Sequence, residues 1–302
     1  MAGHDDAGSP GAVISSPAND KLKQARRLRR SRQRASEHAF LIEGYRELAR
    51  AVEGDIAIRD LFTCPELWTA RNEQGLTDLV ESRGGRISVL TARAFASLAG
   101  QETPDGVLGV AEMPDVGLDR QTVAFTAPGQ PLVMVVEGIE RPGNLGTIAR
   151  TCAGTGVSGL IVCDPQVDPF HPEVVRASVG ALFSLPLSVV STGEFLVWVR
   201  DQAVRLVVSS PTAERSYDRA VVTGPTALVV GSEKSGVTDD MRDAADELVR
   251  LPMTGGVDSV NVAVAAGVLV FDALRQRAGR GESGGAMSRV SLGPDELDGG
   301  TR

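Results

Sequence analysis

Short apolar runs alternate with amphipathic stretches along most of the chain. The runs are rich in Val, Ile and Leu and are typical of buried strands, whereas the stretches between them have helical spacing. The pattern predicts strands over 40–44, 58–64, 86–90, 106–113, 131–138, 159–164, 185–190, 205–210, 226–232 and 247–253. It predicts helices over 21–34, 45–54, 66–82, 92–100, 143–156, 172–181, 193–202 and 259–278. Because strands alternate with helices, the chain is predicted to be an α/β protein with mostly parallel sheets.

The periodicity is interrupted at three places, which suggests the domain boundaries. Residues 115–130 have no strong period and are predicted to be a linker between a domain over 21–114 and a domain over 131–280. The ends, 1–20 and 281–302, are rich in Gly, Ser, Pro and acidic residues and are predicted to be disordered tails. A length of 302 residues suits two domains.

Composition narrows the class of protein. Hydrophobic residues make up 42% and charged residues 23%, which is typical of a globular chain. No apolar run is long enough for a membrane helix, and the first residues do not resemble a signal peptide, so we expect a soluble, cytoplasmic protein. The three cysteines and three histidines are widely spaced, so we expect neither a metal site nor a disulfide framework.

Charge is distributed unevenly. The net charge is −8, yet residues 21–34 contain eight basic residues and no acidic one. Such a segment on an acidic chain predicts an arm that binds nucleic acid phosphates, with a solvated helix end as the alternative. The basic residues are Lys21, Lys23, Arg26, Arg27, Arg29, Arg30, Arg32 and Arg34.

A glycine motif at residues 154–159, GTGVSG, matches the dinucleotide-binding spacing. That motif binds a pyrophosphate only where it follows a strand and begins a helix. Here the predicted helix precedes the glycines and the strand follows them. The motif is therefore predicted to be a helix C-cap and turn.

Three segments at predicted strand ends carry polar residues where open α/β sheets bind ligands: GIERPGNLGTIAR, VVGSEKSGV and LPMTGGVDSVNVAVAAG. Asn144 begins a helix that carries Arg150, and Glu233 lies among glycines and serines. Ser259 and Asn261 lie at the start of an apolar helix that is expected to be buried. Each segment alone has a simpler explanation: Arg150 would be a solvated arginine, Glu233 would lie in an ordinary turn, and Ser259 would cap a helix. Capping explains Ser259 and leaves Asn261 for a ligand.

Together, the three segments resemble the motifs of the SpoU family of RNA ribose methyltransferases, which belongs to the SPOUT class. The matching residues are Asn144, Gly146 and Arg150, then Gly231, Glu233 and Gly236, then Pro252, Met253, Ser259, Asn261 and Val262. Val260 stands where leucine is commoner in the family, and Glu140 and Arg141 are assigned no role. Residues 27–54 also resemble the start of the ribosomal-protein-like RNA-binding domain that many members carry.

The resemblance implies a SPOUT-type parallel sheet with a C-terminal trefoil knot, preceded by a smaller ribosomal-protein-like α/β/α RNA-binding domain. It also implies a homodimer, formed through the knot and the C-terminal helix, whose sites combine both subunits. The implied cofactor is S-adenosyl-L-methionine. The positions that match cofactor contacts are Gly231, Leu251, Met253, Val260 and Ser209.

The implied reaction is methyl transfer to a ribose 2′-hydroxyl of ribosomal RNA, with the large subunit favoured. A transfer RNA substrate and a non-catalytic RNA-binding or ribosome-assembly protein are the alternatives. Arg150 would act as general base or orient the ribose and a phosphate, the second role suiting its high pKa better. Asn144 and Asn261 would position the substrate, Glu233 would organise its loop or Arg150, and Ser259 would complete the site. Arg176 either binds RNA phosphate or is solvated.

Overall fold

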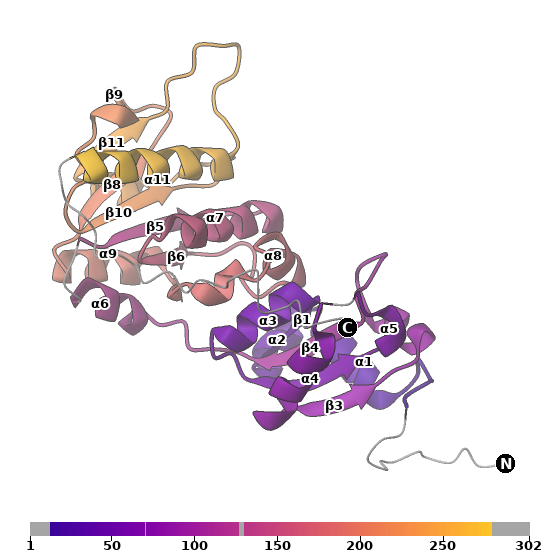
Figure 1. The fold of residues 1–302 in the computed structure, drawn as a ribbon. Coiled ribbons are helices and arrows are strands. Elements are labelled where there is room, and N and C mark those ends of the chain that lie inside the picture. Colours follow the sequence, from indigo (N-terminus) through magenta and orange to yellow (C-terminus); the bar gives the residue numbers. More distant parts are fainter. Residues whose placement is uncertain (1–12, 70, 127–129, 280–302) are drawn as a thin grey trace, which may run out of the picture.

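The computed structural model describes residues 13–69, 71–126 and 130–279. Within them the chain forms two sheets, one in each half (Figure 1). The predicted tail over 281–302, and residues 1–12 of the other predicted tail, lie outside the described residues. No helix among the described residues is long and apolar enough to span a membrane.

The N-terminal domain is a four-stranded sheet with helices on both faces. Its elements are α1 (Asp20–Arg27), α2 (Ser31–Glu37), β1 (Ala39–Glu43), α3 (Tyr45–Glu53), β2 (Ile58–Thr63), η1 (Pro65–Leu67), α4 (Glu73–Ser82), β3 (Arg86–Val89), α5 (Ala92–Leu98) and β4 (Val107–Glu112). The strand order is β1-β4-β2-β3. Leu22, Ala25 and Leu28 on and after α1 pack against one face of the sheet, and Leu48 of α3 packs against the other.

The prediction of a mostly parallel sheet is wrong for this domain. β4 is antiparallel to both β1 and β2, and only β2 and β3 are parallel. The last strand enters the middle of the sheet between β1 and β2, and the alternation of helices and strands does not determine the direction of such an inserted strand. The predicted helix over 21–34 is also divided into α1 and α2 by a turn at residues 28–30.

The predicted tail over 1–20 is partly structured. Ile14 forms a bridge with Leu90, its N–H donating to the carbonyl of Val89, and Asn19 caps α1 by accepting a hydrogen bond from the Lys21 amide. Residues 13–19 therefore belong to the domain, because backbone groups beside β3 hold them.

The C-terminal domain is a seven-stranded sheet within the described residues. Its elements are α6 (Asp119–Thr126), β5 (Leu132–Glu137), α7 (Pro142–Thr155), β6 (Gly159–Cys163), α8 (Pro172–Ala177), η2 (Ala181–Ser184), β7 (Leu187–Val190), α9 (Thr192–Asp201), β8 (Arg205–Ser209), β9 (Arg215–Ser216), η3 (Tyr217–Arg219), β10 (Thr226–Val230), α10 (Asp239–Asp243), β11 (Glu247–Arg250) and α11 (Val262–Gly279). The order is β7-β6-β5-β10-β8-β11-β9, and every neighbouring pair is parallel. The predicted parallel sheet is confirmed here.

Side chains alternate between the two faces of this sheet, as a strand's twofold repeat requires. Met134 and Val136 of β5 pack on the side of α7 and α11, whereas Val133 and Val135 pack on the side of α9 and α10. All four are fully or almost fully buried, which explains the unbroken apolar runs in the sequence.

The predicted linker over 115–130 contains a helix, α6. Gln121 on α6 is fully buried, and its amide donates to the carbonyl oxygen of Pro186 at 2.8 Å. Val116 accepts a hydrogen bond from Val189 of β7. The stretch between the two sheets is therefore ordered at α6, because it packs against the edge of the C-terminal sheet.

A single apolar core connects the two domains. Phe40 of β1 packs against Phe170 and Phe183 of the C-terminal domain, with ring centroids 4.8 Å and 5.8 Å apart. Beside them, the buried Arg34 guanidinium contacts the Asp168 carboxylate at 2.7 Å. Figure 1 shows α3 and β1 against α8 at this boundary. The orientation of the two domains is therefore fixed by packed side chains.

Candidate active site

The carboxyl ends of three adjacent strands lie side by side in the C-terminal sheet. β10, β8 and β11 are consecutive in the strand order. Ser209 is the last residue of β8, Gly231 follows β10 directly and Leu251 follows β11 directly. Neighbouring parallel strands are about 4.8 Å apart, so these residues lie along the edge where open α/β sheets bind ligands. The half-buried Met253 follows, and Val260 lies further along the same loop.

The segment after β10 closes into a tight turn. The Ser232 amide donates to the Gly236 carbonyl at 3.0 Å, and the Gly236 amide donates back to the Ser232 carbonyl at 2.9 Å. A Cβ atom at Gly231 would lie 2.3 Å from the carbonyl carbon of Gly236, and Gly236 has a φ of +69°. Only glycine suits either position, because one lacks space and the other is left-handed. The two glycines thereby let the ends of the turn approach each other closely.

Three residues from the three sequence segments meet in one hydrogen-bonded cluster. The Asn261 side-chain amide donates to Asn144 Oδ1 at 3.0 Å and to Glu233 Oε1 at 3.0 Å. The Asn144 amide donates to the same Glu233 oxygen at 3.1 Å. These residues lie at the start of α7, in the turn after β10 and just before α11. The structure thus joins three of the five predicted catalytic residues.

Asn261 has a second partner. Its Oδ1 accepts a hydrogen bond from the Ala263 amide at 3.0 Å, so Asn261 caps α11, which begins at Val262. The expectation that Ser259 caps this helix is wrong. Ser259 is exposed, two residues short of the cap position, and forms no hydrogen bond with the described residues. The side chain of Asn261 therefore both caps α11 and takes part in the cluster.

Two charged residues that the sequence left without a role also connect these loops. Arg141 Nε lies 3.5 Å from Glu233 Oε2, and Glu140 forms an ion pair with Lys234. Opposite charges on the two loops are visible in the sequence, but nothing in their spacing shows that the loops meet. The loop before α7 and the turn after β10 are therefore paired by charge as well as by hydrogen bonds.

A buried carboxylate holds the chain next to these loops through hydrogen bonds. Glu137, the last residue of β5, is 3% exposed and accepts hydrogen bonds from the amide and hydroxyl of Thr238, each at 2.8 Å. It also accepts one from the Thr192 hydroxyl at 2.7 Å. Sequence reasoning missed Glu137, although a glutamate at the end of an apolar run was the available signal. It fixes the chain just after the turn to β5, the strand beside β10.

Arg150 lies outside the cluster. It is exposed on α7, on the helix face that also exposes Gly143, Thr147 and Gly154. Glu233 contacts Asn144, Asn261 and Arg141, so the expectation that Glu233 organises Arg150 is not met within one chain. Arg150 has no partner among the described residues, which leaves its guanidinium available.

The basic arm divides into structural and available residues. Arg26 donates to the carbonyl of Pro17, Arg29 pairs with Glu43 at 2.6 Å, and Arg34 is 1% exposed in its contact with Asp168. The expectation that Arg34 binds RNA is corrected, because its buried guanidinium is enclosed between the domains. Exposed residues of the arm are Lys21, Lys23, Arg27, Arg30 and Arg32, of which Lys23 pairs with Asp20. Arg176, on α8, is also exposed.

Other chemistry has little support. The three cysteines are buried, and burial raises the pKa of the Cys152 thiol to about 12, so it is not a thiolate nucleophile at neutral pH. Among the described residues, no group of His, Cys, Asp and Glu could hold a metal ion. Gly156 ends α7 in the left-handed conformation, which confirms that the 154–159 glycines form a helix C-cap and turn.

Comparisons with known proteins agree with this geometry. The SpoU rRNA Methylase family matches residues 131–271, and the MRM3-like substrate binding domain matches residues 19–109. A 23S rRNA (uridine(2479)-2′-O)-methyltransferase of Streptomyces viridochromogenes is 33% identical over 281 residues, covering 89% of this chain and 94% of the relative. RlmP of Bacillus subtilis, a 23S rRNA (guanosine(2553)-2′-O)-methyltransferase, is 25% identical, covering 85% of this chain and 97% of the relative.

A solved structure shares most of the fold. The AdoMet-bound rRNA methyltransferase of Sinorhizobium meliloti aligns with a TM-score of 0.79 and 27% identity, covering 87% of this chain and 97% of that one. The parallel sheet, with polar loops at the carboxyl ends of its strands, thus defines an α/β methyltransferase of the SPOUT class. The chain belongs to the SpoU rRNA methylase family.

Proposed function

We propose that the chain transfers the methyl group of S-adenosyl-L-methionine to a ribose 2′-hydroxyl of 23S ribosomal RNA. The observation that carries this proposal is the cluster of Asn144, Glu233 and Asn261, which joins the three family motifs beside the strand ends of β10, β8 and β11. The relatives named above methylate 23S rRNA at the 2′ position. Because these relatives are bacterial proteins that act on ribosomal RNA, the proposal includes a cytoplasmic enzyme.

The residues at the strand ends suit this cofactor. Gly231 packs against Gly236 and carries no side chain, so its backbone would form part of the ledge on which the cofactor would rest. Ser209 lies beside Gly231 on the neighbouring strand β8, and Leu251 lies one strand further along the edge. Met253 and Val260 lie further along the loop before α11. When bound, the cofactor supplies a methyl group on a positively charged sulfur. The proposal includes a knotted passage of the chain through residues 231–236 and 252–258.

The chain's own residues would orient and activate the hydroxyl. The reaction forms a bond from the ribose oxygen to the methyl carbon and breaks the carbon–sulfur bond, and the hydroxyl proton passes to the adjacent phosphate or to water. Asn144 and Asn261 would hold the ribose, because their amides are fixed by Glu233. Arg150 would bind the phosphate beside that ribose and orient the hydroxyl, since a guanidinium is a strong phosphate ligand and a poor base. Ser259 would contact the substrate at the edge of the site.

The proposal includes a homodimer whose sites are shared. The helix α11 is not buried on all sides as the sequence predicts, because Val264 is 54% exposed and Phe271 is 62% exposed. These residues are two helical turns apart and so lie on one face. Covering that face with a second copy would bury both side chains, and could bring Arg150 of one chain to the cluster of the other.

Mixed dimers test the shared site. Arg150→Ala and Glu233→Ala chains are each expected to lose activity, and together they should regain roughly a quarter of it if the two residues act across the interface, because half of the dimers then carry one intact site. The mixture is assayed after joint refolding, with each variant refolded alone as the control. A mixture as inactive as its components would show that both residues serve the same chain's site.

The reaction itself is tested with methyl-labelled cofactor. The protein is incubated with protein-free 23S rRNA and, separately, with transfer RNA, and the products are hydrolysed in alkali. We expect label from 23S rRNA in alkali-resistant dinucleotides, because a 2′-O-methyl group prevents cleavage of the adjacent phosphodiester. Resistant label from transfer RNA alone would establish the alternative substrate. Alkali-sensitive label would mean base methylation, and RNA binding without label would support the non-catalytic alternative.

A further inference from the structure

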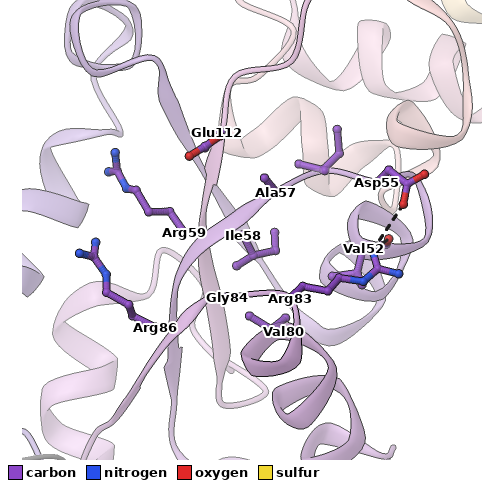
Figure 2. Close-up of a pocket in the computed structure, with 11 residues that line it drawn as sticks. Val52, Asp55, Ala57, Ile58, Arg59, Val80, Arg83, Gly84, Arg86 and Glu112 are labelled. Carbon is purple, nitrogen blue, oxygen red and sulfur yellow. Dashed lines mark hydrogen bonds and ion pairs between the residues drawn. The ribbon is translucent and has the colours of Figure 1, made fainter.

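Two cavities on the N-terminal domain share a pair of arginines. The first, of about 500 Å³, has an apolar floor that includes Ile58 and Val80 (Figure 2). The second, of about 640 Å³, lies between α1 and the sheet, over Leu28, Phe62 and Val110 among others. Arg59 of β2 and Arg86 of β3 line both. In Figure 2 their guanidinium groups point to the same side, away from Arg83 and Asp55.

One carboxylate orients the two arginines. Asp60 accepts hydrogen bonds from Arg86 Nε and Nη2 at 2.8 Å and 2.9 Å, and lies 3.4 Å from Arg59 Nε. Two positive charges therefore share one negative charge. The Arg86 side chain is 67% exposed and that of Arg59 is 38% exposed. The pair is held in place and remains open to an anion.

The opposite wall of the second cavity is also basic. Lys21, Gln24 and Arg27 recur at three-residue intervals on α1, are exposed, and line this cavity. Neither Lys21 nor Arg27 forms a hydrogen bond through its side chain with the described residues. With Arg59 and Arg86 the cavity has four cations against two anions, Glu37 and Asp60, in a chain whose net charge is −8. Positive charge is thus concentrated in a groove that has an apolar floor.

We propose that this groove, defined by Lys21, Gln24, Arg27, Arg59 and Arg86, binds a single-stranded segment of the RNA substrate. The inference rests on the proposed function, of which it names a recognition surface. Arginines and lysine on the two walls suit phosphates, and the partly exposed Ile56 and exposed Ala57 of the first cavity give apolar surface that suits an unstacked base, which a duplex does not offer. An acidic protein segment would match the charges but would leave this apolar surface unexplained.

The groove lies far from the candidate active site, so it would contact RNA away from the methylated nucleotide. Figure 1 shows α1 and β3 on the side of the N-terminal domain that faces away from the C-terminal sheet. Because Arg34 and Asp168 fix the domains together, RNA held in the groove would lie at a set place relative to the cluster. The groove would then raise affinity for RNA without touching the reacting atoms.

Binding of a labelled single-stranded RNA tests the groove. Fluorescence anisotropy is measured at several salt concentrations for three double variants: Arg59→Gln/Arg86→Gln, Lys21→Gln/Arg27→Gln, and the control Arg46→Gln/Arg93→Gln. All three remove two positive charges, but Arg46 and Arg93, which are exposed on the same domain, do not line the groove. The groove variants should weaken binding about tenfold or more and flatten the salt dependence by roughly 0.7 per lost phosphate contact, and the control should change it less than twofold.

Several results would overturn the proposal. Equal losses in control and groove variants would mean diffuse attraction to positive charge anywhere on the domain, and no loss in either groove variant would exclude the groove. If the groove variants bound RNA as the unaltered chain does but bound ribosomal subunits more weakly, the groove would be assigned to an acidic protein of the subunit instead. Thermal melting monitors folding, and the Lys21→Gln/Arg27→Gln variant breaks no ion pair. Methyl transfer by the unaltered chain separates a failed groove from a failed proposed function, since only the latter abolishes transfer.

Discussion

Two regions of the molecule join residues that are far apart in the sequence: the interdomain contact and the candidate active site. The first is buried and the second is open to solvent. Arg34 and Asp168 form a charged pair whose guanidinium is 1% exposed, beside the packed rings of Phe40 and Phe170. Asn144, Glu233 and Asn261 form a neutral-to-charged network at an open surface. Breaking a buried pair is costly because the remaining charge is left unpaired, whereas an open network can exchange its partners for a substrate.

The comparison separates residues that fix architecture from residues that meet the ligand. Substituting a residue of the first kind should lower the free energy of unfolding with little effect on methyl transfer. Substituting a residue of the second kind should lower methyl transfer with little effect on stability. Arginines illustrate the division within one segment, because Arg34 is enclosed between domains while Arg27 lines an open groove. Residue type alone therefore does not indicate function in this protein; the burial of the charged group does.

The largest effect is expected at Asn261. Asn261→Ala removes two of the three hydrogen bonds of the cluster and the helix cap, so methyl transfer should fall by about 100-fold, as when one fixed donor is lost from an active site. The free energy of unfolding should fall by only about 1 kcal/mol, the usual cost of losing an N-cap. Methyl transfer is measured with saturating cofactor, and stability by urea unfolding.

A serine at the same position separates the two roles of Asn261. Serine caps helices well but cannot donate to both Asn144 and Glu233 as the amide does. Asn261→Ser should therefore keep the stability of the unaltered chain and still lose most of the activity. Activity near that of the unaltered chain in Asn261→Ser would show that capping, rather than the amide network, is what the reaction needs.

The sequence predicted the parts of this structure that depend on local pattern. Apolar runs placed the parallel strands of the C-terminal domain, and polar residues after β5, β10 and β11 placed Asn144, Glu233 and Asn261 at one edge. The direction of β4 was not predictable in this way, because strand direction depends on which neighbours it pairs with. Nor was the burial of Gln121, since a polar residue in a weakly periodic stretch carries no signal of its partners.

Charged residues were the least predictable. Arg29 and Arg34 look like the rest of the basic arm in the sequence, yet Arg29 pairs with Glu43 and Arg34 with Asp168, which lies in the other domain. Arg141 reaches Glu233 through a loop pairing that only the tertiary fold creates. A run of like charge predicts an average property of a segment, and tertiary contacts decide which members remain available.

Substituting Asp168 is expected to change activity less, and stability more, than substituting Asn261. Asp168→Ala leaves the buried Arg34 with only the carbonyls of Leu28 and Arg29, and also removes the acceptor for the Phe170 amide, so unfolding free energy should fall by about 3 kcal/mol. Adding Arg34→Met removes the unpaired charge and should restore at least half of that loss. Cofactor affinity, measured by calorimetry, should stay within twofold in both variants. A loss of cofactor affinity as large as the loss of stability would mean that the interdomain contact shapes the site directly, and the separation between the two regions would fail.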